Sequence, residues 1–266
     1  MTGNTQDARG FTETADIETS SDGYACRFEG PVGAWFLEVQ ERIVLSMLGD
    51  GPPREAPPVD RRGHGCRTPA PETSIMDVGG GHGQLALPLC RRGYKVTVLA
   101  SDESCRQRIA AAVESGRCTF KTGSVVDLPF PDRSFDVVIC FRLLPHCTQW
   151  QRLIAELCRT AKRSVIVDYP SSRSFNAVAP LLFGAKKKIE QNTRQWRTFR
   201  HREIRDSFSL NGFDPHRRLA QFFLPMALHR LLGCRRLSAR SEGVFRVLGM
   251  TTLFGSPSIV EMRRRA

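Results

Sequence analysis

The sequence predicts an α/β protein built on a doubly wound, largely parallel sheet of seven strands with helices on both faces. From residue 74 to residue 170, short apolar runs alternate with helical segments, which is typical of repeated β-α-β units. These strands are apolar throughout rather than alternating, as expected when both faces of a sheet are covered. A glycine-rich stretch stands where the first strand passes into a helix, and ligands of such folds bind at that edge.

Each element follows from its local pattern. The expected strands are residues 74–80, 95–100, 118–125, 134–142, 163–170, 216–225 and 258–265. Before them, residues 31–48 place apolar side chains at helical spacing after Pro31, which predicts an amphipathic helix. The segments between the strands have helical spacing, as in residues 148–161, where Leu153, Ile154 and Leu157 share one face.

The domain organisation predicted from these patterns is one globular unit with additions. The expected parts are a polar, disordered N-terminus (1–22), an amphipathic helix region (23–50), a Pro/Gly/Arg-rich loop (51–72) and the main domain (73–266) with helical insertions around 171–198 and 226–252.

Composition narrows the classes of function. The 266 residues carry a net charge of +12, which suits nucleic acid, an anionic membrane surface or an acidic substrate without choosing among them. Nine dispersed cysteines without a CxxC pair predict buried thiols in a reducing compartment rather than a metal site. Without a signal peptide or an apolar run long enough to span a bilayer, we expect a cytoplasmic protein, with peripheral membrane contact left open.

The stretch "DVGGGHG" (77–83) is the motif that carries chemistry. Glycines let a ligand approach the backbone, and the helix that follows offers unpaired N–H groups. The spacing is neither the GxGxxG of nicotinamide-binding folds nor a phosphate-gripping loop. Asp77, two residues before the first glycine, suits a cationic ligand or an amine.

Three stretches in order resemble the class I S-adenosylmethionine (SAM)-dependent methyltransferases: "IMDVGGGHGQLALPLCRRGYKVTVL", "GSVVDLPFPDRSFDVVICFRLLPH" and "VIVDYP". The second is similar to the subgroup of ubiquinone and menaquinone C-methyltransferases and small-molecule methylases. The resemblance implies a Rossmann-like methyltransferase fold with SAM as cofactor.

It also implies residue roles. The cofactor-binding positions are Asp77, Gly79, Gly80, Gly81, His82 and Gly83 around the methionine moiety, Ser124, Val125 and Asp127 near the adenine, and Phe141 on the sulfonium side. Asp127 as a loop cap and Phe141 as ordinary core are the structural alternatives.

The sequence departs from the family at the end of the second strand, where an acidic residue normally binds the ribose and Ala100 stands instead. We expect Ser101 and Asp102 to take over this contact. Water and backbone groups, or a degenerate site, are the alternatives.

Two residues are candidates for catalysis. His146 follows the fourth strand near the carboxyl edge of the sheet, where we expect it to act as a base, and Tyr169 follows the fifth strand, where we expect it to hydrogen-bond a substrate. The alternatives are a capping or loop role for His146 and a buried structural role for Tyr169. The later insertions combine apolar and basic residues, which favours a small or lipid-like hydrophobic acceptor, methylated at carbon or oxygen. No metal is expected.

Two alternatives to this enzyme stay open. Ala100 supports a catalytically silent cofactor-binding or scaffold protein. The basic charge suggests a nucleic-acid methyltransferase, but the tetrapeptide that such enzymes carry after the fourth strand is absent, and we expect no nucleic-acid partner.

Overall fold

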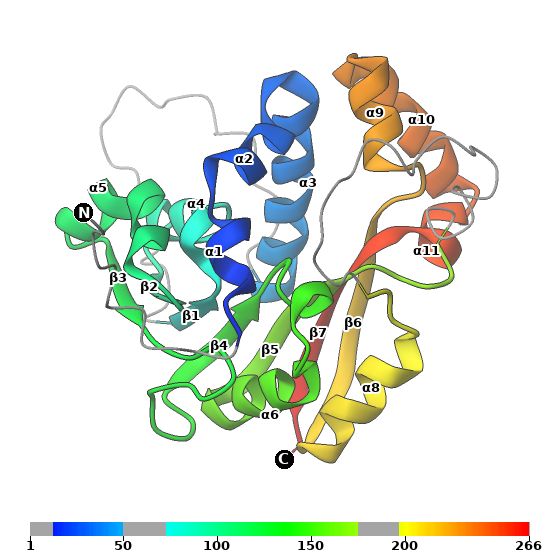
Figure 1. Cartoon of the computed structure of the whole chain (residues 1–266). Coiled ribbons are helices and arrows are strands. Elements are labelled where there is room, and N and C mark those ends of the chain that lie inside the picture. Colours follow the sequence, from blue (N-terminus) through cyan, green and yellow to red (C-terminus); the bar gives the residue numbers. More distant parts are fainter. Residues whose placement is uncertain (1–12, 50–72, 175–196, 266) are drawn as a thin grey trace, which may run out of the picture.

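A seven-stranded sheet forms the centre of the protein (Figure 1). The structure, a computed structural model, describes residues 13–49, 73–174 and 197–265. The strands are β1 (Ser74–Val78), β2 (Lys95–Ala100), β3 (Cys118–Thr122), β4 (Phe135–Cys140), β5 (Ala161–Tyr169), β6 (Phe213–Phe222) and β7 (Ser256–Arg264), in the order β3-β2-β1-β4-β5-β7-β6. The first five strands are parallel, and β7 is antiparallel to β5 and β6. The predicted fold class is confirmed.

Helices cover both faces of this sheet. One core lies against α6 (Trp150–Thr160) and α8 (His201–Leu210). The other lies against α3 (Gly30–Leu48), α4 (Ala86–Arg91), the 3₁₀ helix η3 (Glu103–Ile109) and α5 (Ala110–Glu114). Leu153, Ile154 and Leu157 are all buried, as the helical spacing of their segment predicts.

The N-terminal segment differs from the expectation. Residues 1–22 were expected to be disordered, but from residue 13 onward the chain folds into α1 (Ala15–Thr19) and α2 (Asp22–Ala25), followed by η1 (Cys26–Phe28). The prediction is therefore wrong for residues 13–22. The side chains of Glu13 and Asp16 are buried through hydrogen bonds to distant residues, Gln149 and Ser101, which no local pattern reveals.

Two other predicted regions lie wholly or mostly outside the described residues, namely the loop 51–72 and residues 175–196 of the first insertion. The second predicted insertion is helical and contains α9 (Met226–Leu232), α10 (Arg235–Val247) and α11 (Met250–Phe254). In the described ranges, no helix has both the length and the apolar content to cross a membrane.

A buried carboxylate fixes these C-terminal helices to the sheet. Glu242 of α10 accepts hydrogen bonds from the backbone N–H groups of Phe223 and Leu224, each at 2.8 Å. Its Oε1 also lies 3.0 Å from Nε2 of His229, which is fully buried beside Trp35. This network joins α9 and α10 to the end of β6.

Candidate functional site

The glycine loop after β1 surrounds a buried carboxylate. Asp77 is 2% exposed, and a Cβ at Gly80 would lie 2.1 Å from its Oδ2. Gly79 and Gly83 both have φ of +75°, a conformation that side chains disfavour. Glycine is therefore required for the backbone to close around Asp77.

Burial changes the acidity of this carboxyl group. The pKa of Asp77 is raised from 3.8 to about 7, because its charged form is desolvated, although a hydrogen bond from the Ala86 backbone opposes the rise. An ionised Asp77 at neutral pH is therefore stabilised by any cation placed beside it.

A set of unpaired nitrogen atoms lies around Asp77. A cavity of about 20 Å³, room for about one water molecule, is lined by Asp77 together with Gln40, His82, Gln84 and Arg142. Within the part of the chain that the structure describes, each of the last four residues has at least one buried nitrogen without a hydrogen-bond partner: Nε2 of Gln40, both ring nitrogens of His82, Nε2 of Gln84 and one terminal nitrogen of Arg142. Buried donors without acceptors are rare, so this group is suited to a polar ligand.

Arg142 organises one side of the cavity. Arg142 is the second residue after β4, and its φ of +61° is unusual for a residue with a side chain. Its N–H donates to Oδ1 of Asp168 at 2.6 Å, which holds this backbone conformation. Its guanidinium group donates to Oε1 of Gln40 at 2.8 Å and lies 3.9 Å from the ring centre of Phe28. The sequence analysis missed Arg142, although a charged residue at the end of an apolar strand was a usable signal.

A carboxylate from another part of the chain lies at the end of β2. The side chain of Asp16, on α1, accepts hydrogen bonds from the N–H and the hydroxyl of Ser101, both at 2.6 Å. Asp16 is fully buried, and burial raises its pKa. An acid at position 100 would bring a second negative charge close to Asp16, so Ala100 is compatible with this arrangement. Nothing in the polar N-terminal sequence indicated that Asp16 reaches this position.

The same helix lies directly on the glycine loop. A Cβ at Gly79 would be 3.4 Å from Cβ of Asp16, and one at Gly81 would be 2.7 Å from Oγ of Ser20. In this conformation, α1 occupies the space above the loop. The cavity in this conformation, about 20 Å³, is too small for a ligand of the size of SAM.

The other predicted cofactor residues are distributed around this centre. Phe141 is buried and lines the cavity. The carboxylate of Asp102 accepts a hydrogen bond from the Ser104 N–H at 2.9 Å and caps η3. Ser124 bridges to the exposed Asp127 after β3, and Val125 is core. The ribose and adenine contacts of these residues stay predictions.

The two catalytic candidates lie elsewhere. His146 belongs to the short 3₁₀ helix η4 (Leu144–His146), and it is not among the residues that line the cavity around Asp77. The Tyr169 hydroxyl lies 2.8 Å from Nδ1 of His201, in a separate pocket on the α8 face. The structure therefore does not bring either residue next to Asp77, and a catalytic role for them stays a prediction.

The central part of the chain is similar to known methyltransferases. Residues 76–167 match the family described as a methyltransferase domain. The chain is 32% identical over 120 residues to a demethylmenaquinone methyltransferase of Deinococcus radiodurans, covering 41% of this chain and 49% of the relative. It is 33% identical over 89 residues to a ubiquinone biosynthesis O-methyltransferase of Rickettsia conorii, covering 33% of this chain and 31% of the relative. The chain thus matches less than half the length of either curated relative.

A solved structure shares the fold over nearly the whole chain. Magnesium protoporphyrin IX methyltransferase of Synechocystis PCC 6803, with bound S-adenosylhomocysteine, is 17% identical with a TM-score of 0.60. The match covers 94% of this chain and 98% of the other. At this identity the likeness concerns the fold.

We predict that Gly81→Ala separates α1 from the glycine loop. The new Cβ would lie 2.6 Å from the Cys105 carbonyl oxygen of η3 and 2.7 Å from Oγ of Ser20 at the end of α1, so the loop must shift relative to both elements. The melting temperature should fall by about 5 °C, and the α1 amides should exchange hydrogen faster.

The control is Gly243→Ala on α10, where an added Cβ meets no atom within 4 Å. It should leave both measurements unchanged or raise the melting temperature slightly. Unaltered exchange of α1 in Gly81→Ala would contradict the packing described above.

Proposed function

We propose that this chain, whose residues 76–167 form a methyltransferase domain of the SAM-dependent class, transfers a methyl group from SAM to a small or lipid-like hydrophobic acceptor, at carbon or oxygen. The observation that carries the proposal is that buried Asp77 lines the same cavity as several nitrogen atoms without hydrogen-bond partners among the described residues.

Asp77 and the surrounding nitrogen donors are complementary to the ammonium and carboxylate groups of the methionine part of SAM. Asp77 is suited to the α-ammonium group, because the cation would stabilise the ionised carboxylate. Gln40, Gln84 and Arg142 present N–H donors to a carboxylate. The glycine loop allows such a ligand to lie against the backbone once α1 has opened.

When bound, SAM supplies an electrophilic methyl group, and the protein mainly provides orientation. Phe141 places an apolar surface at the cavity. Burial and the nearby Arg142 and Arg108 lower the pKa of His82 to about 4, so its imidazole is neutral at pH 7 and adds no competing positive charge.

Two observations support the acceptor class. The relatives named for menaquinone and ubiquinone act on quinone-type acceptors, and the C-terminal helices of this chain expose an apolar surface. The closed cavity and Ala100 favour the second candidate, a protein of this fold that is catalytically silent. Calorimetry with S-adenosylhomocysteine (SAH) separates the two, because a silent scaffold that has lost the site gives no binding heat at near-millimolar ligand.

We predict that SAH binding depends on the ionisation of Asp77. Its pKa of about 7 is raised above the ordinary value, so the carboxylate is present above pH 7 and lost below it. Calorimetry should show affinity falling about tenfold for each pH unit below 7 and levelling off above it.

In Asp77→Asn this dependence should disappear, with binding at pH 8 weakened about tenfold or more. The control Asp214→Asn removes an exposed carboxylate that pairs with Arg265 and should behave as the wild type. An unchanged pH profile in Asp77→Asn would sink the assignment.

Asp16 and the ribose compete for Ser101 in our proposal. While α1 is closed, the N–H and hydroxyl of Ser101 are held by Asp16; when α1 opens, both groups become available to the ribose. Asp16→Ala should therefore strengthen SAH binding, by about tenfold, because two buried hydrogen bonds no longer oppose opening. A tenfold loss would instead show that Asp16 itself holds the cofactor.

The surface of α9–α11 supports a lipid-associated site. Among the described residues, every large hydrophobic side chain that is exposed, except Leu210, lies between residues 231 and 254. The segment 226–254 contains five arginines and one acid, the buried Glu242. We propose that this surface contacts an anionic bilayer, because exposed apolar side chains insert and arginines attract acidic headgroups. Figure 1 shows α9 and α10 beside α3, with α1 and α2 on the other side of α3.

Flotation with vesicles tests this contact. The protein should float with vesicles that contain about half phosphatidylglycerol, and less with pure phosphatidylcholine. Leu231→Ser combined with Val247→Ser removes side chains that are 83% and 89% exposed and should abolish most of the binding. Leu210→Ser, at 88% exposure on α8, is the matched control and should bind normally. Equal flotation of both variants would refute the contact.

A further inference from the structure

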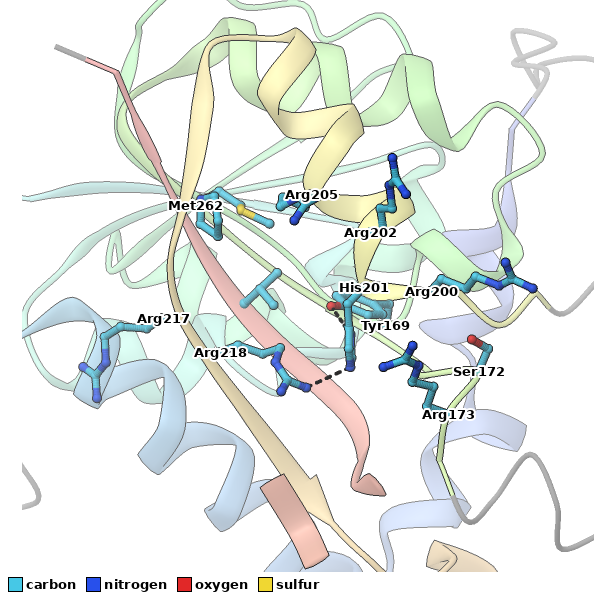
Figure 2. A pocket seen from close by; sticks show the side chains of 12 residues that line it. Tyr169, Ser172, Arg173, Arg200, His201, Arg202, Arg205, Arg217, Arg218 and Met262 are labelled. Atoms are coloured by element: carbon cyan, nitrogen blue, oxygen red, sulfur yellow. Dashed lines mark hydrogen bonds between the residues drawn. The ribbon is translucent and has the colours of Figure 1, made fainter. Parts of the chain in front are cut away.

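A second and larger pocket lies on the opposite face of the sheet from the cavity around Asp77. It has a volume of about 870 Å³, within the usual range of small-molecule sites, and is bounded by the end of β5, the start of α8 and strands β6 and β7 (Figure 2). It shares no lining residue with the cavity around Asp77. No step of the proposed methyl transfer uses it.

Among the described residues, arginines dominate the lining of this pocket and no acidic residue belongs to it. The six are Arg173, Arg200, Arg202, Arg205, Arg217 and Arg218. Within the described ranges, the carboxylate that pairs with them is Asp206, shared by Arg202 and Arg205. The N-terminus of α8 also opens here and adds the positive end of its dipole. The described residues of the pocket therefore carry a large positive charge, which the single carboxylate of Asp206 does not neutralise.

At its centre, Arg218, His201 and Tyr169 form a chain of hydrogen bonds whose direction can be worked out (Figure 2). Arginine can only donate, so Arg218 donates to Nε2 of His201 at 2.8 Å. The proton of the neutral imidazole is therefore on Nδ1, and it is donated to the Tyr169 hydroxyl oxygen at 2.8 Å. The hydroxyl proton of Tyr169 is then available to a further acceptor.

The protonation states agree with this direction. Burial, Arg218 and Arg173 lower the pKa of His201 to about 4, so the ring is neutral at pH 7. Burial raises the pKa of Tyr169, which keeps its proton. Tyr169 is 1% exposed, so a nearly buried hydroxyl donor lies among cations at the pocket wall.

We propose that this pocket binds a small, multiply charged oxyanion, a phosphate- or carboxylate-bearing molecule. The planar guanidinium group matches the two oxygens of either group, and several arginines together favour more than one charge. Figure 2 shows Arg173 and Arg218 on either side of His201. In the proposal these two arginines hold the anion, and the Tyr169 hydroxyl donates a hydrogen bond to it. Val260 and Met262 of β7 and Pro215 of β6 add apolar lining that contacts the rest of the molecule.

Calorimetry with the full-length protein at low ionic strength tests the proposal, using pyrophosphate, citrate and inorganic phosphate as probes. Pyrophosphate or citrate should bind at one site per chain, and more tightly than phosphate, because they engage more arginines. Arg173→Ala should weaken this binding about tenfold, and Tyr169→Phe severalfold. Arg173 is exposed, so its removal leaves the core intact.

Arg240→Ala on α10 is the matched control, since it removes an exposed arginine outside the pocket and should leave binding unchanged. Absence of saturable binding, or an equal loss in Arg240→Ala, would overturn the proposal. SAH affinity measured in the same variants should be unaltered, so failure of this site and failure of the proposed methyltransferase activity give different results.

Discussion

Three carboxylates are buried at one edge of the sheet, and the electrostatics of the site follow from them. Asp77 lies near the end of β1, Asp168 lies near the end of β5, and Asp16 reaches the end of β2 from α1. Burial raises the pKa of all three, to about 7 for Asp77 and about 6 for Asp168. Removing carboxylates from water is unfavourable unless cations or N–H groups replace the solvent. At neutral pH this edge therefore favours a cationic ligand.

The strands and the glycine loop could be predicted because their signals are local. Apolar runs of strand length, separated by helical spacing, need no knowledge of distant residues, and glycines before a helix limit what the backbone can do. The position of α1 could not be predicted in this way. Its five residues are mostly polar, and Asp16 is buried because Ser101, 85 residues away in the chain, supplies both of its hydrogen bonds.

The positions of the functional arginines could not be predicted from the sequence either. In the sequence, Arg142, Arg173 and Arg218 resemble solvated surface charge, and composition alone cannot separate them from the rest of the 39 basic residues. The fold brings Arg142 to the cavity through an unusual backbone angle, and it gathers six others from three separate stretches around one pocket. Tyr169 is the last residue of β5, at the carboxyl edge of the sheet. The direction of its side chain could not be predicted, because it depends on how the two faces of β5 pack against the two cores.

Asp168 and Tyr169 are consecutive residues of β5, so their side chains point to opposite faces of the sheet. Asp168 holds the backbone of Arg142 beside one cavity, while Tyr169 lies in the wall of the arginine-lined pocket. A ligand that shifts the end of this strand from one face shifts it for the other as well. The two sites are thus joined through a single peptide unit. If a ligand at one site changes the affinity of the other site by some factor, the second ligand must change the affinity of the first site by the same factor.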